Sequence, residues 1–171
     1  AKIMVEGRDA EAALQLLAAN DIAVPVGRTV YTPLLNRRGG FESDLTIARL
    51  GPERFMIVTG SAQPVRDRDW MARNLPAHLP AVTLTDVTGA YAVLALMGPR
   101  ARDLVMRLSG DDWSHAGFPF GTIRPVSIGK ATCLASRRSY MGELGWELYV
   151  PVEFAAMVYD ALTGAGQDLG L

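Results

Sequence analysis

The 171 residues include 49% hydrophobic side chains, which is enough for one core or for two fused lobes. Seventeen basic and eighteen acidic residues leave a formal net charge of −1 with the two signs interspersed, which argues against a nucleic-acid-binding protein. A single cysteine excludes an internal disulfide, and no apolar stretch approaches the roughly 20 residues of a membrane-spanning helix.

The first half of the chain is predicted to begin with a short strand and an amphipathic helix. Residues 3–5 are apolar, and Asp9 is placed to cap a helix over residues 9–20. The helix is predicted from four apolar residues at the spacing of one helix face, Ala10, Ala13, Leu14 and Leu17. Three strands, a weaker helix and a last strand are then predicted, at residues 28–36, 41–50, 55–59, 64–75 and 82–87.

The second half repeats this pattern with an offset of 91 residues. Gly98 follows an apolar run as Gly7 does, and Pro99 suits the first position of a helix. The apolar residues of that helix are Ala101, Leu104, Val105 and Leu108. Three strands and a closing helix follow, at residues 122–128, 131–138, 146–150 and 152–163. We therefore expect an α+β fold of two related lobes, residues 1–88 and 89–171, with antiparallel strands and packed helices.

Most familiar catalytic motifs are absent. The sequence has neither common form of the glycine-rich phosphate loop, no cysteine pair and no serine-hydrolase elbow. His78 and His115 lie alone in predicted loops, where a histidine is more often solvated than a ligand, so no metal site is predicted. Cys133 lies in a predicted strand and is interpreted as a small buried hydrophobic residue.

Polar residues stand among core residues in the second arm of the hairpin over residues 31–50. Strand alternation places Ser43 on the same face as Leu45 and Ile47, and Asp44 on the other face. A buried hydroxyl bonded to backbone is one interpretation of Ser43. The other interpretation is that the side chain of Ser43 faces a pocket.

A second unusual segment covers residues 137–151. Gly142 and Gly145 lie on either side of Glu143, which predicts a tight turn that holds one carboxylate among aromatic side chains. Those aromatic residues are Tyr140, Trp146 and Tyr149. Such a site suits a flat heterocycle, whereas an ordinary turn would leave the glutamate in water.

Together these segments resemble the folate-binding domain of the glycine cleavage T-protein (aminomethyltransferase) family. The matching runs, in family order, are YTPLLN..GG..SDLTIARL, LMGPRARDLV and RRSYMGELGWELYVP. The resemblance covers nearly the whole chain, and SYxGELGWELYVP is closer to the C-terminal part of dimethylglycine and sarcosine dehydrogenases. It implies that the two lobes form one folate-binding core and that the chain is a fragment of a larger one.

The resemblance further implies that the domain binds tetrahydrofolate and accepts a one-carbon unit from a methylated amine. Glu143 matches the glutamate that accepts hydrogen bonds from the exocyclic amine and the ring N–H of the pterin. The match also assigns two aromatic residues that line the folate path, Tyr31 and Tyr140, and an apolar wall, Leu45 and Ile47. In the family the contact with the folate tail belongs to an arginine beyond residue 171. Arg138 and Arg137 are candidates for a contact with the glutamate tail here, and a solvated strand edge is the other interpretation of both.

At one position the sequence departs from the family. Family members have paired aspartates after the double glycine, and the first contacts the reacting folate nitrogens. Ser43 stands at that position and Asp44 at the second, so these two are the candidate catalytic residues. A serine can donate a hydrogen bond but supplies no negative charge. Slower transfer, rescue by Asp44 through a local bulge, and capture of an imine made at a separate flavin site are the routes left open.

The expected function is one-carbon transfer in an amine-demethylating enzyme whose FAD lies in a neighbouring domain. One alternative is a non-catalytic folate-binding or scaffold module that has lost the acid. Another is a two-lobed domain that uses its aromatic-rich loop for subunit contacts. We expect no nucleic-acid or membrane partner, and a location in the cytoplasm or, in a eukaryote, the mitochondrial matrix.

Overall fold

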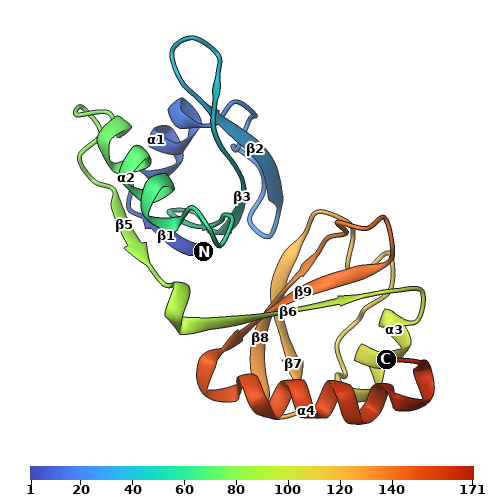
Figure 1. The fold of residues 1–171 in the computed structure, drawn as a ribbon. Helices are drawn as coiled ribbons and strands as arrows, with labels where there is room; N and C mark the ends of the chain where they lie inside the picture. Colours follow the sequence, from blue (N-terminus) through green and yellow to red (C-terminus); the bar gives the residue numbers. More distant parts are fainter. The chain divides into compact units, whose positions relative to one another are not determined.

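The computed structural model describes residues 1–171 as two compact units, Ala1–Thr88 and Gly89–Leu171 (Figure 1). Each unit contains one antiparallel sheet with two helices packed on one face, which confirms the predicted α+β fold class. The longest helix has 12 residues, and none has the length and apolar content needed to span a membrane.

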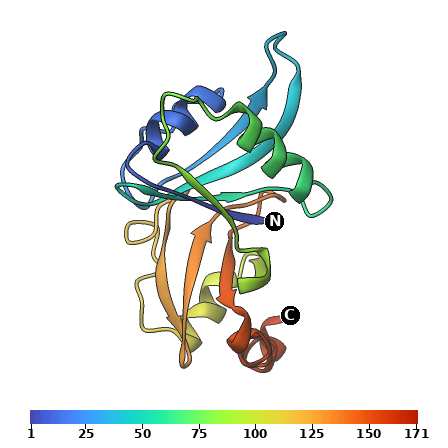
Figure 2. The same cartoon turned by 90° about the vertical axis from the view of Figure 1, so that its left-hand side faces the viewer.

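The first unit has a five-stranded sheet in the order β2-β3-β4-β1-β5. Its strands are β1 (Lys2–Glu6), β2 (Thr29–Leu35), β3 (Phe41–Gly51), β4 (Arg54–Val58) and β5 (Thr83–Asp86), and its helices are α1 (Ala10–Leu17) and α2 (Pro64–Asn74). Both helices lie on one side of this sheet (Figure 2). Between them and the strands is a core that includes Leu14, Leu34 and Phe55.

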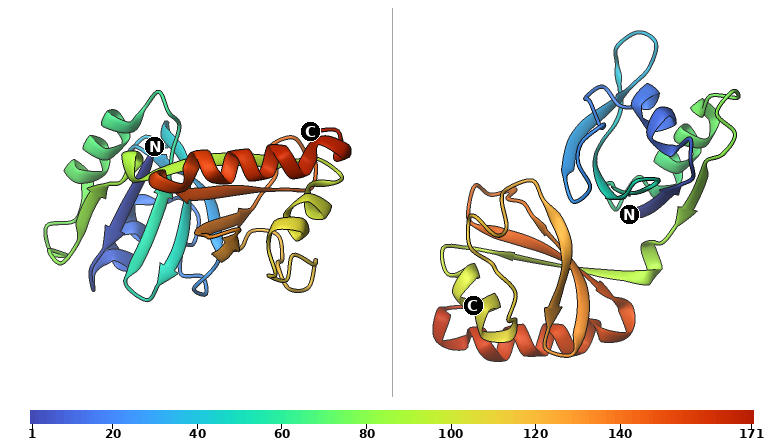
Figure 3. Two further views of the ribbon diagram at one scale, coloured as in Figure 1. Left: turned by 90° about the horizontal axis from the view of Figure 1, so that it is seen from below. Right: turned by 180° about the vertical axis from the view of Figure 1, so that it is seen from behind.

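The second unit has a four-stranded sheet in the order β6-β9-β8-β7. Its strands are β6 (Tyr91–Met97), β7 (Ile123–Ile128), β8 (Ala131–Arg137) and β9 (Gly145–Pro151), and its helices are α3 (Ala101–Leu108) and α4 (Ala155–Gly166). Helix α4 runs along one face of this sheet (Figure 3). The core between helices and sheet contains Trp113 and Trp146, whose rings pack edge to face with centroids 5.2 Å apart.

The two units share one topology, which confirms that they are related lobes. In each, a strand leads to a helix, three antiparallel strands and a second helix, and the first strand pairs with the fourth. Gly7 (φ 129°) donates its N–H to Glu53 O at 3.0 Å, and Gly98 (φ 136°) donates to Leu144 O at 2.8 Å. Helix α3 begins 91 residues after α1 begins and ends 91 residues after α1 ends. Strand β5 of the first unit has no counterpart in the sheet of the second unit.

Some helix ends differ from the prediction. Helix α1 ends at Leu17 and not at residue 20, because Ala18 is extended (φ −80°, ψ 141°) and forms a β-bridge with Leu34. Helix α3 has Arg100 at its N-cap, so Pro99 lies before the helix and not at its first position.

Candidate functional site

The open face of the first sheet, which is the face away from α1 and α2, carries a tyrosine–carboxylate pair. The hydroxyl of Tyr31 on β2 donates to Oδ2 of Asp44 on β3 at 2.6 Å. Because Tyr31 is opposite Thr46 and Pro33 is opposite Asp44, the pair are diagonal neighbours on one face. The hydrogen bond to Asp44 is the main cause that raises the pKa of Tyr31. Both side chains are exposed, so a ligand on this face would meet a carboxylate and a protonated phenol.

Ser43 lies on the opposite, helix-covered face of β3. It is only 6% exposed, it is opposite the core residue Leu34, and its Oγ has no hydrogen-bond partner. Leu45 and Ile47 share that face and are part of the core. The structure therefore places these two residues, which were expected to form an apolar wall, in the core between the sheet and its helices, since alternate residues of a strand share one side.

A hollow of about 290 Å³ lies in the second unit, beside the loop that precedes β9. Gly142 has φ 83°, as the predicted tight turn requires, and the exposed Glu143 and half-buried Arg138 both line the hollow. The other lining residues are His115, Phe120, Arg137, Ser139, Gly142, Leu144 and Gly145. The structure thus brings together two of the predicted binding residues, and they have opposite charge.

The aromatic surroundings of this hollow differ from the prediction. Tyr140 is 99% exposed and does not line the hollow, because it projects from the turn into solvent. Trp146 and Tyr149 lie on opposite faces of β9, with Trp146 in the core. The aromatic residue that lines the hollow is Phe120.

Arg137 and His115 form a hydrogen-bonded pair at the hollow. Arg137 is 8% exposed, and it donates from Nη1 to Phe118 O at 2.6 Å. Its Nη2 lies 2.7 Å from Nδ1 of His115. A guanidinium has no acceptor, so Nδ1 must accept and the neutral imidazole carries its proton on Nε2. The positive charge of Arg102, then that of Arg137, lowers the pKa of His115, with a smaller contribution from desolvation.

A second tyrosine–carboxylate pair lies on the face of the second sheet that points away from the core residue Trp146. The hydroxyl of Tyr149 donates to Oε2 of Glu147 at 2.6 Å, and Tyr149 is 1% exposed. Burial, followed by the charge of Glu147, raises the pKa of Tyr149. Ser136 is opposite Glu147 on β8, and its buried Oγ has no partner. The sequence contains a signal for this pair, because Glu147 and Tyr149 are two positions apart in one predicted strand and therefore share a face.

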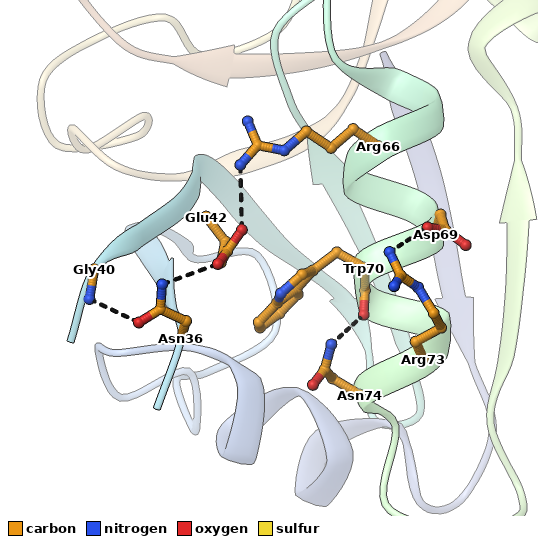
Figure 4. Close-up of polar contacts among 8 residues, drawn as sticks. All are labelled: Asn36, Gly40, Glu42, Arg66, Asp69, Trp70, Arg73 and Asn74. Atoms are coloured by element: carbon orange, nitrogen blue, oxygen red, sulfur yellow. Dashed lines mark hydrogen bonds and ion pairs between the residues drawn. The ribbon is translucent and has the colours of Figure 1, made fainter. Parts of the chain in front are cut away.

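A separate hollow of about 490 Å³ lies in the first unit between α1, α2 and the β2–β3 turn. Asn36 Nδ2 donates to Oε1 of Glu42 at 3.0 Å, and Arg66 Nη2 donates to Oε2 at 3.2 Å. Figure 4 shows both contacts, with Glu42 near the ring of Trp70. The hydrogen bond from Asn36, then that from Arg66, lowers the pKa of Glu42. Because both oxygens of Glu42 already accept from the protein, this carboxylate serves to order the turn.

Comparison with known proteins assigns the chain to a family. Residues 1–171 match the family model of the GCVT N-terminal domain. The chain is 42% identical over 171 residues to 4-methylaminobutanoate oxidase (formaldehyde-forming) of Paenarthrobacter nicotinovorans, with 100% of this chain and 20% of that protein covered. It is 34% identical over 170 residues to the mitochondrial dimethylglycine dehydrogenase of Mus musculus, with 99% of this chain and 19% of that protein covered.

A solved structure is also similar to this chain. The crystal structure of glycine cleavage system aminomethyltransferase T from Bartonella henselae has a TM-score of 0.80 and 25% identity, and the match covers 95% of this chain and 43% of that one. The chain spans about a fifth of the length of the two curated relatives. The resemblance seen in the sequence, to aminomethyltransferases and to demethylating dehydrogenases, is confirmed, and the chain belongs to the GCVT N-terminal domain family.

Proposed function

We propose that this chain is the tetrahydrofolate-binding, one-carbon-accepting domain of an amine-demethylating enzyme. The relatives support this class, since one is a formaldehyde-forming methylaminobutanoate oxidase and another a dimethylglycine dehydrogenase. The observation that carries the proposal is the Tyr31–Asp44 pair, because it puts an exposed carboxylate on the open sheet face within the same β3 segment that follows the double glycine, Gly39 and Gly40.

The hollow of the second unit fits the chemistry of a folate. Glu143 offers two acceptors for the exocyclic amine and ring N–H of a pterin. Ser139 brings a buried hydroxyl with no partner in the protein, and Arg138 brings a positive charge suited to a carboxylate of the glutamate tail. These residues would hold the folate by charge-assisted hydrogen bonds.

Tetrahydrofolate, when bound, supplies the nitrogens that take up the one-carbon unit. In this proposal Asp44 stabilises positive charge that develops near those nitrogens and holds a proton released there. Tyr31 donates to one carboxylate oxygen and orients the other toward the ligand. Asp44 lies on this face by ordinary strand alternation, and the register shift of the β2–β3 pair, at Leu34/Leu35, comes just before Ser43 and Asp44. In this proposal Asp44 takes the place of the missing first aspartate.

Neighbouring parts of the full-length protein complete the proposed reaction. The relatives are about five times as long as this chain, so we place FAD and the oxidation of the methylated amine in a neighbouring domain. We place the protein in the cytoplasm or the mitochondrial matrix. The alternative of a module that has lost its acid is not supported, because Asp44 keeps a carboxylate on the open face.

The test is to replace Asp44 by asparagine in the full-length enzyme, with Ser43→Ala as the matched control one residue away. We expect Asp44→Asn to lower transfer to tetrahydrofolate by about 100- to 1,000-fold, because one preorganised charged group is lost. Amine oxidation should continue and formaldehyde should be released instead. Methylene-tetrahydrofolate is measured in the presence of a formaldehyde trap, with dimethylglycine and 4-methylaminobutanoate as trial substrates. Unchanged transfer in Asp44→Asn would refute the role of the pair.

A further inference from the structure

His115 lines the hollow that also contains Glu143, and its ring nitrogens have a fixed hydrogen-bonding polarity. Because Arg137 donates to Nδ1 at 2.7 Å, the ring nitrogen left for a ligand is Nε2, which carries the proton. Arg137 is buried and also donates to Phe118 O at 2.6 Å, so the arrangement is held from the protein side. His115 therefore offers a ligand a donor and no acceptor.

Other groups of the hollow can also donate, because the guanidinium groups of Arg137 and Arg138 are donors only. Two of the nitrogens of Arg137 are already used, and Arg138 also has an interaction within the protein. The Ser139 hydroxyl has no partner but can rotate to donate or to accept. Arg102 and Arg137 keep the His115 ring neutral near pH 7, because they lower its pKa.

Building on the proposed function, we propose that His115 Nε2–H donates to the 4-carbonyl oxygen of the pterin ring and thereby makes the site specific for a 2-amino-4-oxo ring. Along one edge of that ring the 2-amino group, N3–H and the 4-carbonyl follow one another as donor, donor and acceptor. Glu143 would supply the two acceptors and His115 the donor, and both residues line the same hollow. A ring with a donor in the third place would put donor against donor, which costs binding.

Two substitutions separate a ligand contact from a structural role. Asparagine can keep an acceptor for Arg137 at the position of Nδ1 but has no group at the position of Nε2. Glutamine keeps an N–H at the position of Nε2 but leaves Arg137 without that acceptor. Binding of tetrahydrofolate to the full-length protein is measured by anaerobic calorimetry for wild type, His115→Asn, His115→Gln, Ser139→Ala and Glu143→Gln, and thermal unfolding of each variant is recorded.

We expect His115→Asn to weaken binding by about tenfold, as for loss of one buried hydrogen bond, and His115→Gln to restore most of it. Wild-type affinity in His115→Asn, a larger loss in His115→Gln, or an equal loss in both would overturn the inference, because His115 would then act through Arg137 or not at all. A loss in Ser139→Ala with none in His115→Asn would move the contact to the serine. If Glu143→Gln binds as wild type does, or if wild type binds no tetrahydrofolate, the proposed function itself fails.

Discussion

Replacing Ser43 by aspartate is expected to destabilise the first unit and not to raise one-carbon transfer. The family motif alone favours the opposite result, since it has aspartate at this position. In the structure Ser43 is 6% exposed, is opposite Leu34, and makes no hydrogen bond that a carboxylate could inherit. An introduced carboxylate would lose most of its water without gaining a partner.

The cost of this substitution follows from proton linkage. Burial raises the pKa of the introduced carboxyl above its ordinary value of about 4. If the folded protein keeps the group protonated at pH 7, the free energy of unfolding falls by about 1.4 kcal/mol for each pH unit above the ordinary pKa of about 4. At pH 7 the total loss is about 4 kcal/mol. Both states are protonated below about pH 4, so the loss is absent there and grows as the pH rises to 7.

The free energy of unfolding of the full-length protein is measured with denaturant at pH 4 and pH 7, and hydrogen exchange in peptides from β3 is used as the probe of the first unit. Ser43→Asn is the neutral control of similar size, and it should show no such pH dependence. Equal stability of Ser43→Asp and Ser43→Asn at pH 7 would refute the reasoning. Faster one-carbon transfer in Ser43→Asp would do so as well, because the side chain would then reach the ligand.

Four further predictions concern other features of the chain. Glu143→Gln should lower the affinity for tetrahydrofolate by about 1–3 kcal/mol per broken hydrogen bond in calorimetry and leave the unfolding temperature unchanged, whereas equal affinity would remove Glu143 from the site. Gly98→Ala should cost about 1–3 kcal/mol through backbone strain alone, since nothing lies within 4 Å of an added Cβ. Gly7→Ala should cost about 1–3 kcal/mol more in denaturant unfolding, because its Cβ would also meet the carbonyl oxygen of Ala81. Cys133 is buried, which raises its pKa to about 11, so a thiol reagent at pH 8 should modify it only after unfolding.

Much of the fold could be predicted from local patterns. The apolar spacing around Leu14 and Val105 predicted α1 and α3, and the 91-residue offset predicted the shared topology. The patterns could not predict where α1 ends. The helix stops at Leu17 because Ala18 bridges to Leu34, a contact made by a distant strand. Helix propensity carries no information about such a partner.

The candidate site was only partly predictable. Strand alternation alone assigned Ser43 to the core side, but the family motif suggested a catalytic place for it. The link between Tyr31 and Asp44 depends on the register of β2 and β3, which is set by their pairing and not by spacing along the chain. Similarly, the role of His115 depends on Arg137, which is 22 residues away in the chain.

The position of β1 affects how the first unit forms during synthesis. Ile3 pairs with Ile57 on one side and with Asp86 on the other, so β1 has no partner until β4 has left the ribosome and keeps one open edge until β5 follows. By contrast β2, β3 and β4 are joined in sequence and pair through short connections. A nascent chain that pauses between β4 and β5 therefore exposes the edge of an apolar strand, and chaperones that bind extended apolar segments would act at that point.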